Sequence, residues 1–376
     1  MLIARIRRVN KTIGQLLFIG VSGETLTADE TTFIVENNIG GIVLFSRNLK
    51  EPKQIHALCT EIQNLRHRMI DKAPLFIGVD MEGGRVMRLK APFTPWPALK
   101  KLGDLDNSSV TYHFSYRMGL ELKAVGFNLD FAPCVDVLTN PKNTVIGDRA
   151  LSSDFKMVDK QASALVRGYI KAGIITCAKH FPGHGNTMLD SHLALPIEET
   201  DLKQLQEREI IPFKKVIKSR VDMLMMAHIL FPNIDPSGPV TFSEKFIKQI
   251  VREDLRYKGI VISDDLDMKA MTNKWSREEI PVKALQAGIE VLLYCNEPDS
   301  PVIALESITT AIAQGQLDKN YLESLKQKVL ALKKEKLTTP DPMVFSESIK
   351  VIGHPDHLKL AEALQTGQVP AGLLPE

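Results

Sequence analysis

Residues 174–180 read IITCAKH, a continuous apolar run that ends directly on a lysine and a histidine. An apolar run without polar alternation is typical of a strand that is buried on both faces of a parallel sheet. Short β-rich apolar runs recur along the whole chain. They are 16–19, 41–45, 75–79, 128–131, 174–178, 223–227, 260–262 and 291–295.

The segments between these runs carry helical signals. In 156–172 the apolar residues fall on one stripe with helical spacing. The segment 51–68 begins with a Glu-Pro pair, and Ser243 precedes the segment 244–256 as a candidate N-cap. Eight strand–helix units within about 300 residues are typical of a closed (β/α)8 barrel of the TIM type.

An open, doubly wound α/β sheet is the alternative fold. Such a sheet carries a glycine-rich turn after its first strand and an acidic residue about 20 residues later. The turn after the first run here reads IGVSGETLT, which lacks this fingerprint. We therefore predict the barrel.

The character of the chain changes after about residue 336. The sequence LTTPDPM is typical of a linker, DHLKLAEALQ could form one short helix, and the end is rich in glycine and proline. We predict a barrel domain over residues 1–336 and a C-terminal extension of unassigned role over residues 337–376.

Composition excludes several classes of protein. The 376 residues are 44% hydrophobic and 24% charged, which excludes a disordered chain, a collagen-like fibre and a coiled coil. The net charge of +2 predicts no general attraction to nucleic acid or to an anionic membrane. No apolar run reaches the roughly 18 residues of a membrane-spanning helix, and the run 16–21 is short for a secretory signal. The four scattered cysteines form no C-x-x-C pair, so we expect buried, reduced thiols in a cytoplasmic protein.

Polar or ionisable residues follow six of the eight runs. The active site of a β/α barrel lies at the C-terminal ends of its strands, where such residues converge. We therefore predict a site on this rim. The candidates are Asp80, Asp130, Lys179 with His180, His228, Asp264 with Asp265, and Asn296.

The segment KHFPGHGNTMLDSH, residues 179–192, holds the densest group of reactive side chains. Its spacing leaves three interpretations open. Imidazole hydrogen bonds could hold the loop together, Asp190 could orient His192 for proton transfer, or His180, His184 and His192 could bind zinc or iron. The neighbouring lysine and the lack of a specific ligand spacing such as H-E-x-x-H argue against the metal.

Two further motifs offer carboxylates and guanidinium groups. In VISDDLDM, Asp264 could act as a nucleophile or could merely cap the next helix. In DMEGGRVMR, Asp80 with Arg85 and Arg88 could bind hydroxyl groups or could form a structural ion pair. Arg149, in NTVIGDRAL, is by itself more typical of a surface arginine.

Taken together, these motifs resemble a bacterial family 3 glycoside hydrolase. The resemblance is to the single-domain β-N-acetylglucosaminidase (β-hexosaminidase) branch that acts in cell-wall recycling, and it runs from about Ile13 to about Leu337. The combination of KHFPGHG…DSH with SDDL is highly specific. The other motifs that carry the resemblance are IVLFSRN, VDMEGGRVMRL, NLDFAPCVDV, NTVIGDR, MMAHI, VISDDLDM and AGIEVLLYCN.

The resemblance implies a barrel and a retaining enzyme that removes terminal N-acetylglucosamine from peptidoglycan fragments. By resemblance, Asp264 is the nucleophile that forms a covalent glycosyl-enzyme, His192 is the acid/base and Asp190 is its dyad partner. No metal and no organic cofactor are implied. The residues that match sugar-binding positions of the family are Asp80, Arg88, Arg149, Lys179 and His180.

Three positions depart from the family pattern: Met81 replaces the usual Gln, Asn186 the usual Asp, and Asp267 the usual Ser. None of them removes a named catalytic group. A family member that acts on chitooligosaccharides or by phosphorolysis stays an alternative, as does a metal-dependent barrel hydrolase that uses the three histidines. The sequence predicts no nucleic-acid or membrane partner and leaves the oligomeric state open.

Overall fold

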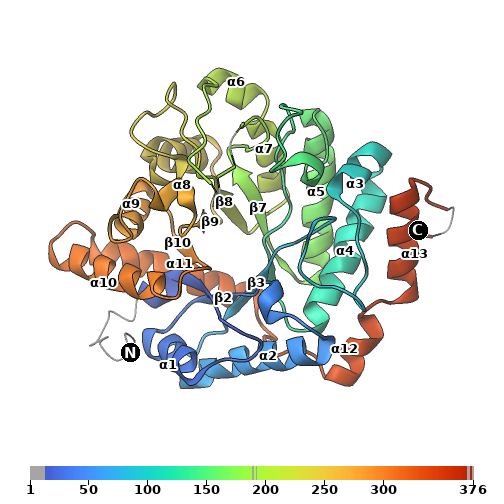
Figure 1. Cartoon of the computed structure of the whole chain (residues 1–376), viewed down its shortest axis with the longest axis horizontal. Coiled ribbons are helices and arrows are strands. Elements are labelled where there is room, and N and C mark those ends of the chain that lie inside the picture. Colours follow the sequence, from blue (N-terminus) through green and yellow to red (C-terminus); the bar gives the residue numbers. More distant parts are fainter. Residues whose placement is uncertain (1–12, 189, 192, 371–372, 375–376) are drawn as a thin grey trace.

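The protein folds as a closed barrel of eight parallel strands, seen in the computed structural model of Figure 1. The structure describes residues 13–188, 190–191, 193–370 and 373–374. Around the barrel the strands follow the order β1-β10-β9-β8-β7-β6-β3-β2, so the predicted (β/α)8 fold is confirmed. The strands are β1 (Leu17–Gly20), β2 (Gly41–Val43), β3 (Phe76–Val79), β6 (Leu129–Asp130), β7 (Ile175–Phe181), β8 (Met223–Met226), β9 (Ile260–Asp265) and β10 (Val291–Tyr294).

Two strands run further than their apolar runs indicate. β7 continues through Lys179 and His180, and β9 continues through Asp264 and Asp265. Backbone pairing explains the extension of β7, because the amide of Val135 donates to the carbonyl oxygen of Lys179 at 2.7 Å. These polar side chains therefore stand on strands rather than on the loops that follow them.

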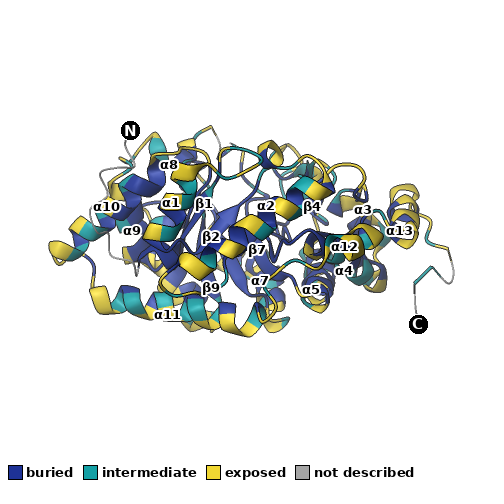
Figure 2. Cartoon of the chain, turned by 90° about the horizontal axis from the view of Figure 1, so that it is seen from below, coloured by how far each residue is buried: buried dark blue, intermediate teal, exposed yellow. Residues whose placement is uncertain are grey.

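Helices follow the strands and cover the outside of the barrel (Figures 1 and 2). In α5 the N-cap Asp154 accepts a backbone hydrogen bond, and the helix ends at Gly173 with φ 81°. As predicted, Ser243 precedes a helix, and its hydroxyl accepts the amide of Phe246 at 3.2 Å. That helix, Lys245–Asp254, has π-type rather than the usual α-type hydrogen bonds. The α-helices of the barrel are α1 (Ala28–Asn37), α2 (Pro52–Asn64), α3 (Leu99–Leu105), α4 (Ser108–Ala124), α5 (Phe155–Ala172), α6 (Leu202–Glu207), α7 (Ile210–Lys218), α8 (Lys269–Thr272), α9 (Glu279–Ala287), α10 (Ser300–Ala313) and α11 (Lys319–Lys336).

The barrel interior is filled by apolar side chains. Phe18 on β1 and Phe76 on β3 lie with their ring centroids 5.3 Å apart. Gly41 on β2 leaves room for Phe18, because a Cβ at this position would lie 2.8 Å from the ring. Burying one such aromatic side chain contributes about 1.5–3 kcal/mol. This core fixes the strands relative to one another, and with them the residues at their ends.

A small antiparallel hairpin follows β3 at the C-terminal end of the barrel. It consists of β4 (Met81–Gly83) and β5 (Val86–Met87). Its turn contains Gly83 with φ 95° and Gly84 with φ 57°, a backbone region that favours glycine. The amide of Gly84 donates to the carbonyl oxygen of Trp96 at 2.8 Å. The hairpin therefore rests on the chain segment that precedes α3.

The segment after α11 forms two helices where the sequence indicates one. These are α12 (Phe345–Val351) and α13 (Pro355–Thr366), which contains DHLKLAEALQ. They lie beside α3 and α4 on one side of the barrel (Figure 1). Arg117 on α4 donates to the carbonyl oxygen of Asp356 at 2.7 Å. We keep the division into residues 1–336 and 337–376 as a proposal; α11 ends at this boundary.

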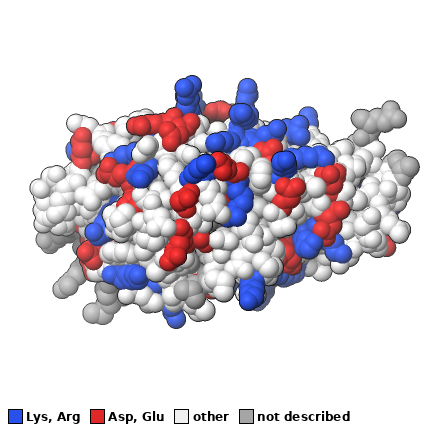
Figure 3. All heavy atoms as spheres, turned by 90° about the horizontal axis from the view of Figure 1, so that it is seen from above, with Lys and Arg blue, Asp and Glu red and all other residues white. Residues whose placement is uncertain are grey.

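Basic and acidic side chains are interspersed on the face of the molecule in Figure 3, as the balanced composition leads one to expect. The four cysteines are buried and have free thiols, which agrees with the prediction from their spacing. Within the described part of the chain, we find no helix with the length and apolar character needed to cross a bilayer.

Candidate active site

A cavity of about 520 Å³ opens at the C-terminal ends of the strands. Charged side chains from β7, β9 and the β4–β5 hairpin face it together with polar residues from several loops, so the predicted convergence on one rim is found. The cavity is lined by Val43, Phe45, Asp80, Glu82, Arg85, Val86, Arg88, Phe131, Thr144, Val145, Arg149, Lys179, His180, Asp190, Met225, Asp264, Asp265, Met268, Leu293, Cys295 and Asn296.

Glu82, on β4, is the centre of an ion-pair network that was not predicted from the sequence. Its Oε1 lies 2.6 Å from Nζ of Lys179, and both carboxylate oxygens accept hydrogen bonds from Arg149 at 2.8 Å. Burial opposes ionisation of Glu82, but Arg149 and Lys179 outweigh it and hold the pKa of Glu82 well below its ordinary value. A signal was available, because Glu82 stands only two residues after the predicted rim residue Asp80.

Lys179 and Arg149 are thereby fixed at the cavity wall as cations. Burial tends to lower the pKa of Lys179, but Asp80 and Glu82 outweigh it and raise that pKa above its ordinary value. The Arg149 side chain is 12% exposed and ends the short 3-10 helix Gly147–Arg149. The expectation of a surface arginine, drawn from the local sequence, is therefore wrong, because its carboxylate partner lies far away in the chain.

Asp80 faces the cavity from the end of β3. It pairs with Nζ of Lys179 at 2.7 Å and lies 3.7 Å from a guanidinium nitrogen of Arg88. Arg85 pairs elsewhere: its Nε donates to Asp148 at 2.9 Å. Of the two arginines considered as partners of Asp80, the structure places only Arg88 beside it.

His180 is oriented by a second carboxylate that was not predicted from the sequence, Asp136. The distance between Nδ1 of His180 and Oδ2 of Asp136 is 2.8 Å. Burial opposes ionisation of Asp136, but His180 and His184 outweigh it and hold its pKa well below the ordinary value. An ionised carboxylate only accepts hydrogen bonds, so Nδ1 of His180 carries a proton and Nε2 is the second ring nitrogen available for other contacts.

His184 serves the loop that follows β7. Its Nδ1 contacts the hydroxyl of Thr187 at 2.8 Å, and its Nε2 contacts the hydroxyl of Ser191 at 3.1 Å. Burial, together with His180, lowers the pKa of His184 to about 4. A neutral imidazole with both nitrogens engaged holds the loop together, which is the first of the three interpretations of this segment.

Asp190 lines the cavity from the same loop. Its carbonyl oxygen accepts the amides of Leu193 and Ala194 at 2.9 and 3.1 Å, which bends the chain at this point. His192, the predicted acid/base, lies outside the described residues. The pairing of Asp190 with His192 therefore stays a prediction.

Asp264 reaches the cavity from β9, and its Oδ1 accepts the amide of Asp265 at 2.8 Å. It does not cap the next helix, whose N-cap is Met268. Asp265 beside it is nearly buried, and its Oδ2 accepts the side-chain amide of Asn296 at 2.5 Å. Burial, together with Asp267 and Asp264, raises the pKa of Asp265 to about 7. Two adjacent carboxyl groups thus have different environments.

Two predicted rim residues do not line the cavity. Asp130 is buried beneath the hairpin, where its Oδ1 accepts the amide of Met81 at 2.9 Å and burial raises its pKa well above the ordinary value. His228 contacts the hydroxyl of Thr241 at 2.6 Å and the carbonyl oxygen of Asp265 at 3.1 Å. Asp130 thus binds the backbone of β4, and His228 binds the backbone of β9, next to residues that line the cavity.

The described residues contain one group that could hold a metal ion: Cys134, Asp136 and His180 have ligand atoms within 4.8 Å of one another. Burial raises the pKa of Cys134 well above its ordinary value, and its thiol donates to Asp136 at 3.2 Å. A metal would have to displace this proton and the one on His180. The predicted set of His180, His184 and His192 is not this group.

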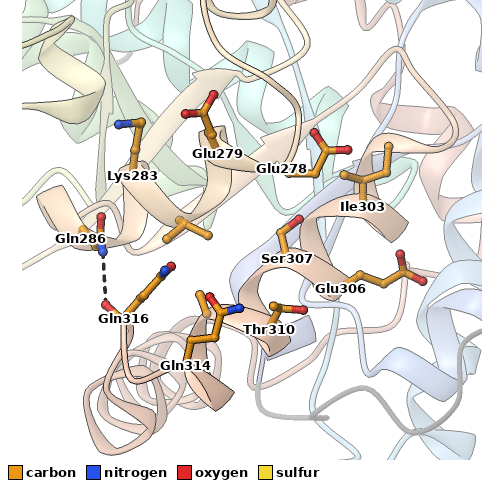
Figure 4. Close-up of a pocket in the computed structure, with 12 residues that line it drawn as sticks. Glu278, Glu279, Lys283, Gln286, Ile303, Glu306, Ser307, Thr310, Gln314 and Gln316 are labelled. Atoms are coloured by element: carbon orange, nitrogen blue, oxygen red, sulfur yellow. Dashed lines mark hydrogen bonds between the residues drawn. The ribbon is translucent and has the colours of Figure 1, made fainter.

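A second hollow lies between α9 and α10, on the outside of the barrel (Figure 4). Glu278, Glu279 and Lys283, at the start of α9 and along it, face Glu306 and Thr310 on α10 across it. It contains none of the predicted site residues. The chemistry of a β/α barrel lies at the strand ends, so we assign the site to the first cavity.

Comparison with known proteins gives a consistent picture. The family model described as "Glycosyl hydrolase family 3 N terminal domain" matches residues 8–332. A β-hexosaminidase of Nitrosomonas eutropha is 36% identical over 298 residues, which cover 78% of this chain and 84% of its own length. A β-hexosaminidase of Glaesserella parasuis is 35% identical over 317 residues, which cover 84% of this chain and 91% of its own length.

Solved structures agree with this relationship. A glycoside hydrolase family 3 β-N-acetylglucosaminidase from Paenibacillus superposes with a TM-score of 0.88 at 32% identity, over 96% of this chain and 69% of that chain. Native NagZ from Neisseria gonorrhoeae superposes with a TM-score of 0.75 at 29% identity, over 94% of this chain and 98% of that chain. The sequence match, the barrel and its rim of charged side chains together place the chain in glycoside hydrolase family 3, and the protein is a glycoside hydrolase.

Proposed function

We propose that this protein is a retaining β-N-acetylglucosaminidase that removes terminal N-acetylglucosamine from peptidoglycan fragments in the cytoplasm. The observation that carries the proposal is the meeting of Asp264 with the Asp80–Lys179–Arg88 group in one cavity. Relatives about 35% identical to this chain are named β-hexosaminidases, which supports the choice of sugar.

In the proposed mechanism Asp264 attacks the anomeric carbon of the sugar. The glycosidic bond breaks, a glycosyl-aspartate forms, and the leaving oxygen receives a proton. Water then attacks the same carbon from the opposite side, which releases the sugar with its original anomeric configuration. The hydrogen bond from the amide of Asp265 orients the Asp264 carboxylate on a rigid strand.

We assign recognition of the sugar to Asp80, Arg88, Arg149, Lys179 and His180. Carboxylate and guanidinium groups on one wall suit hydrogen bonding to neighbouring hydroxyl groups. Glu82 supports the role of this wall, because it fixes both Lys179 and Arg149 through buried ion pairs.

We assign acid and base catalysis to His192, with Asp190 as its partner. Imidazole titrates near neutrality, and a carboxylate beside it stabilises the charged form. Assistance of this kind contributes about 10²–10⁴-fold in rate. His184 contacts Thr187 and Ser191 in the loop that carries both residues. We include closure of this loop over bound sugar before the reaction in the proposed mechanism.

The variant Asp264→Asn tests the nucleophile. We expect kcat on an aryl β-N-acetylglucosaminide to fall by at least about 10³-fold, while the sugar still binds, because the amide retains the shape but not the nucleophilic charge. The matched control Asp254→Asn, on an exposed helix position, should leave kcat unchanged. Mass spectrometry after treatment with a fluorinated glycosyl donor should place the label on Asp264; a label on another residue would contradict the assignment.

The acceptor and the leaving group are tested by NMR on the products. With muropeptide substrate in phosphate-free buffer, we expect free N-acetylglucosamine that appears first as the β-anomer. Appearance of the 1-phosphate when phosphate is added would instead make the protein a phosphorylase. Much faster turnover of chitooligosaccharides than of muropeptides would show that chitin fragments, rather than peptidoglycan fragments, are the preferred substrate.

A metal-dependent hydrolase is the second candidate, and the Cys134, Asp136 and His180 group favours it. We expect activity to survive EDTA and extensive dialysis, because Asp136 already binds the imidazole of His180 and the thiol proton of Cys134. Activity that is lost on chelation and restored by zinc would favour the metal-dependent mechanism.

A further inference from the structure

A buried carboxylate on α4 joins the C-terminal extension to the barrel. Glu121 is 1% exposed. It accepts the amide and the hydroxyl of Thr94, at 3.1 and 2.6 Å, from the segment that precedes α3. From the extension it accepts the amide of Gly353 at 2.9 Å and contacts Nδ1 of His357 at 3.0 Å. Glu121 therefore holds α4, the segment before α3 and the extension together.

The segment that Glu121 holds also supports the β4–β5 hairpin. Trp96, 2% exposed, lies with its ring centroid 6.2 Å from that of His357, and its carbonyl oxygen accepts the amide of Gly84 at 2.8 Å. There is no spare room at this contact, because a Cβ at Gly84 would lie 2.7 Å from Cβ of Ala98. The turn of the hairpin is thus in close contact with residues 94–98.

The hairpin carries Glu82, which fixes Lys179 and Arg149 in the cavity. β4 has three residues and β5 has two, and a two-stranded hairpin of this size is only marginally stable by itself. Its orientation therefore depends on what it packs against. The hairpin packs against residues 94–98, and the extension contacts the same segment through Glu121 and Trp96.

We propose that the C-terminal extension positions the cavity wall that Lys179 and Arg149 form. His357 and Gly353 bind Glu121, and Glu121 binds the segment 94–98. That segment contacts the β4–β5 hairpin, which carries Glu82. His357 is a positioning residue, because it lies outside the cavity and acts through the hairpin. The kinetic part of this proposal rests on the proposed function, whereas its structural part does not.

Amide hydrogen exchange, read by mass spectrometry on the full chain, tests the structural part. We expect His357→Ala to speed exchange in peptides from residues 81–98 by roughly 10- to 150-fold, the range for loss of a buried hydrogen bond to a charged group. His357→Asn, whose amide can donate in place of Nδ1, should restore most of the protection. Leu358→Ala, at the exposed neighbouring position, should leave residues 81–98 unchanged.

Kinetics on an aryl β-N-acetylglucosaminide test the link to the site. We expect KM of the His357→Ala enzyme to rise several-fold with a smaller change in kcat, and His357→Asn to recover KM. Thr94→Val removes the hydroxyl hydrogen bond to Glu121 on the barrel side, keeps the bond from the backbone amide, and leaves the extension in place. It should raise KM in the same direction by a smaller factor, and it serves if His357→Ala does not fold.

Unchanged exchange in 81–98, or wild-type KM in a variant whose hairpin exchanges faster, would overturn the proposal. If the wild-type protein hydrolyses no glycoside, the proposed function fails while the exchange result still decides the structural coupling.

Discussion

Glu82 offsets positive charge on one wall of the cavity. It is 2% exposed and pairs with two cations, Lys179 and Arg149, that come from other parts of the chain. Removing one partner of a buried ion pair is costly, because the remaining charge is left without compensation in a medium of low dielectric constant. Here one carboxylate serves two cations, so its charge matters more than that of an isolated pair.

We expect Glu82→Gln to destabilise the fold by about 3–5 kcal/mol and to raise KM on the order of tenfold, because Lys179 and Arg149 then repel each other at the cavity wall. Urea denaturation and steady-state kinetics measure the two effects. Glu278→Gln, at an exposed position beside the start of α9, is the control and should change neither. A loss of stability below about 1 kcal/mol would show that water solvates Lys179 and Arg149 in the variant, and would contradict the buried ion-pair network.

The β4–β5 hairpin carries Glu82, the carboxylate that fixes Lys179 and Arg149 at the cavity. It is the only antiparallel pair among the described strands, and its two-glycine turn lies against Pro97 and Ala98. At Gly83 the φ of 95° and the contact with the carbonyl oxygen of Pro97 both exclude a side chain. Strain and steric overlap can therefore be separated by experiment.

Gly83→Ala should destabilise the protein by more than Gly315→Ala and should also raise KM. Gly315 has φ 72°, but a Cβ added there would meet nothing within 4 Å, so its substitution costs about 1 kcal/mol of backbone strain alone. Gly83→Ala adds the overlap with Pro97 and displaces Glu82. Thermal unfolding measures the loss of stability, and steady-state kinetics measure KM. Equal effects of the two substitutions would contradict the proposal that the hairpin positions Glu82.

At the scale of the whole molecule, Lys333 connects the last helix of the barrel to its first strands. Its Nζ donates to Oε1 of Gln15 at 2.7 Å and to the carbonyl oxygen of Gly40 at 2.8 Å, and it lies 5.0 Å from the ring centroid of Phe76. Burial lowers the pKa of Lys333 to about 7. Its titration is therefore linked to folding.

Below pH 7 Lys333 is protonated in both the folded and the unfolded chain. Between pH 7 and its ordinary pKa of 10.5 only the unfolded chain keeps the proton, so this group makes stability rise with pH by up to about 1.4 kcal/mol per pH unit. In urea titrations, the difference in unfolding free energy between wild type and Lys333→Met should change by up to about 1.4 kcal/mol for each pH unit within this window. Lys334→Met, exposed on the same helix, is the control. A difference that does not vary with pH would mean that the buried amine keeps an ordinary pKa.

The sequence by itself determined the barrel and most of the rim, because both follow from local patterns of apolar and polar residues. Continuous apolar runs specify strands buried on both faces, and strand topology brings most of the residues that end these runs to the rim. This is why Asp80, Lys179, His180, Asp264 and Asn296 were predictable. The role of His192 stays a prediction.

Only the tertiary structure decided which charges meet. The pairing of Glu82 with Arg149 spans 67 positions, and that of Asp136 with His180 spans 44. The contact of His357 with Glu121 spans 236. No periodicity records such pairs, because they depend on how separate elements pack. A buried charge needs a partner of opposite sign in space, wherever that partner stands in the chain.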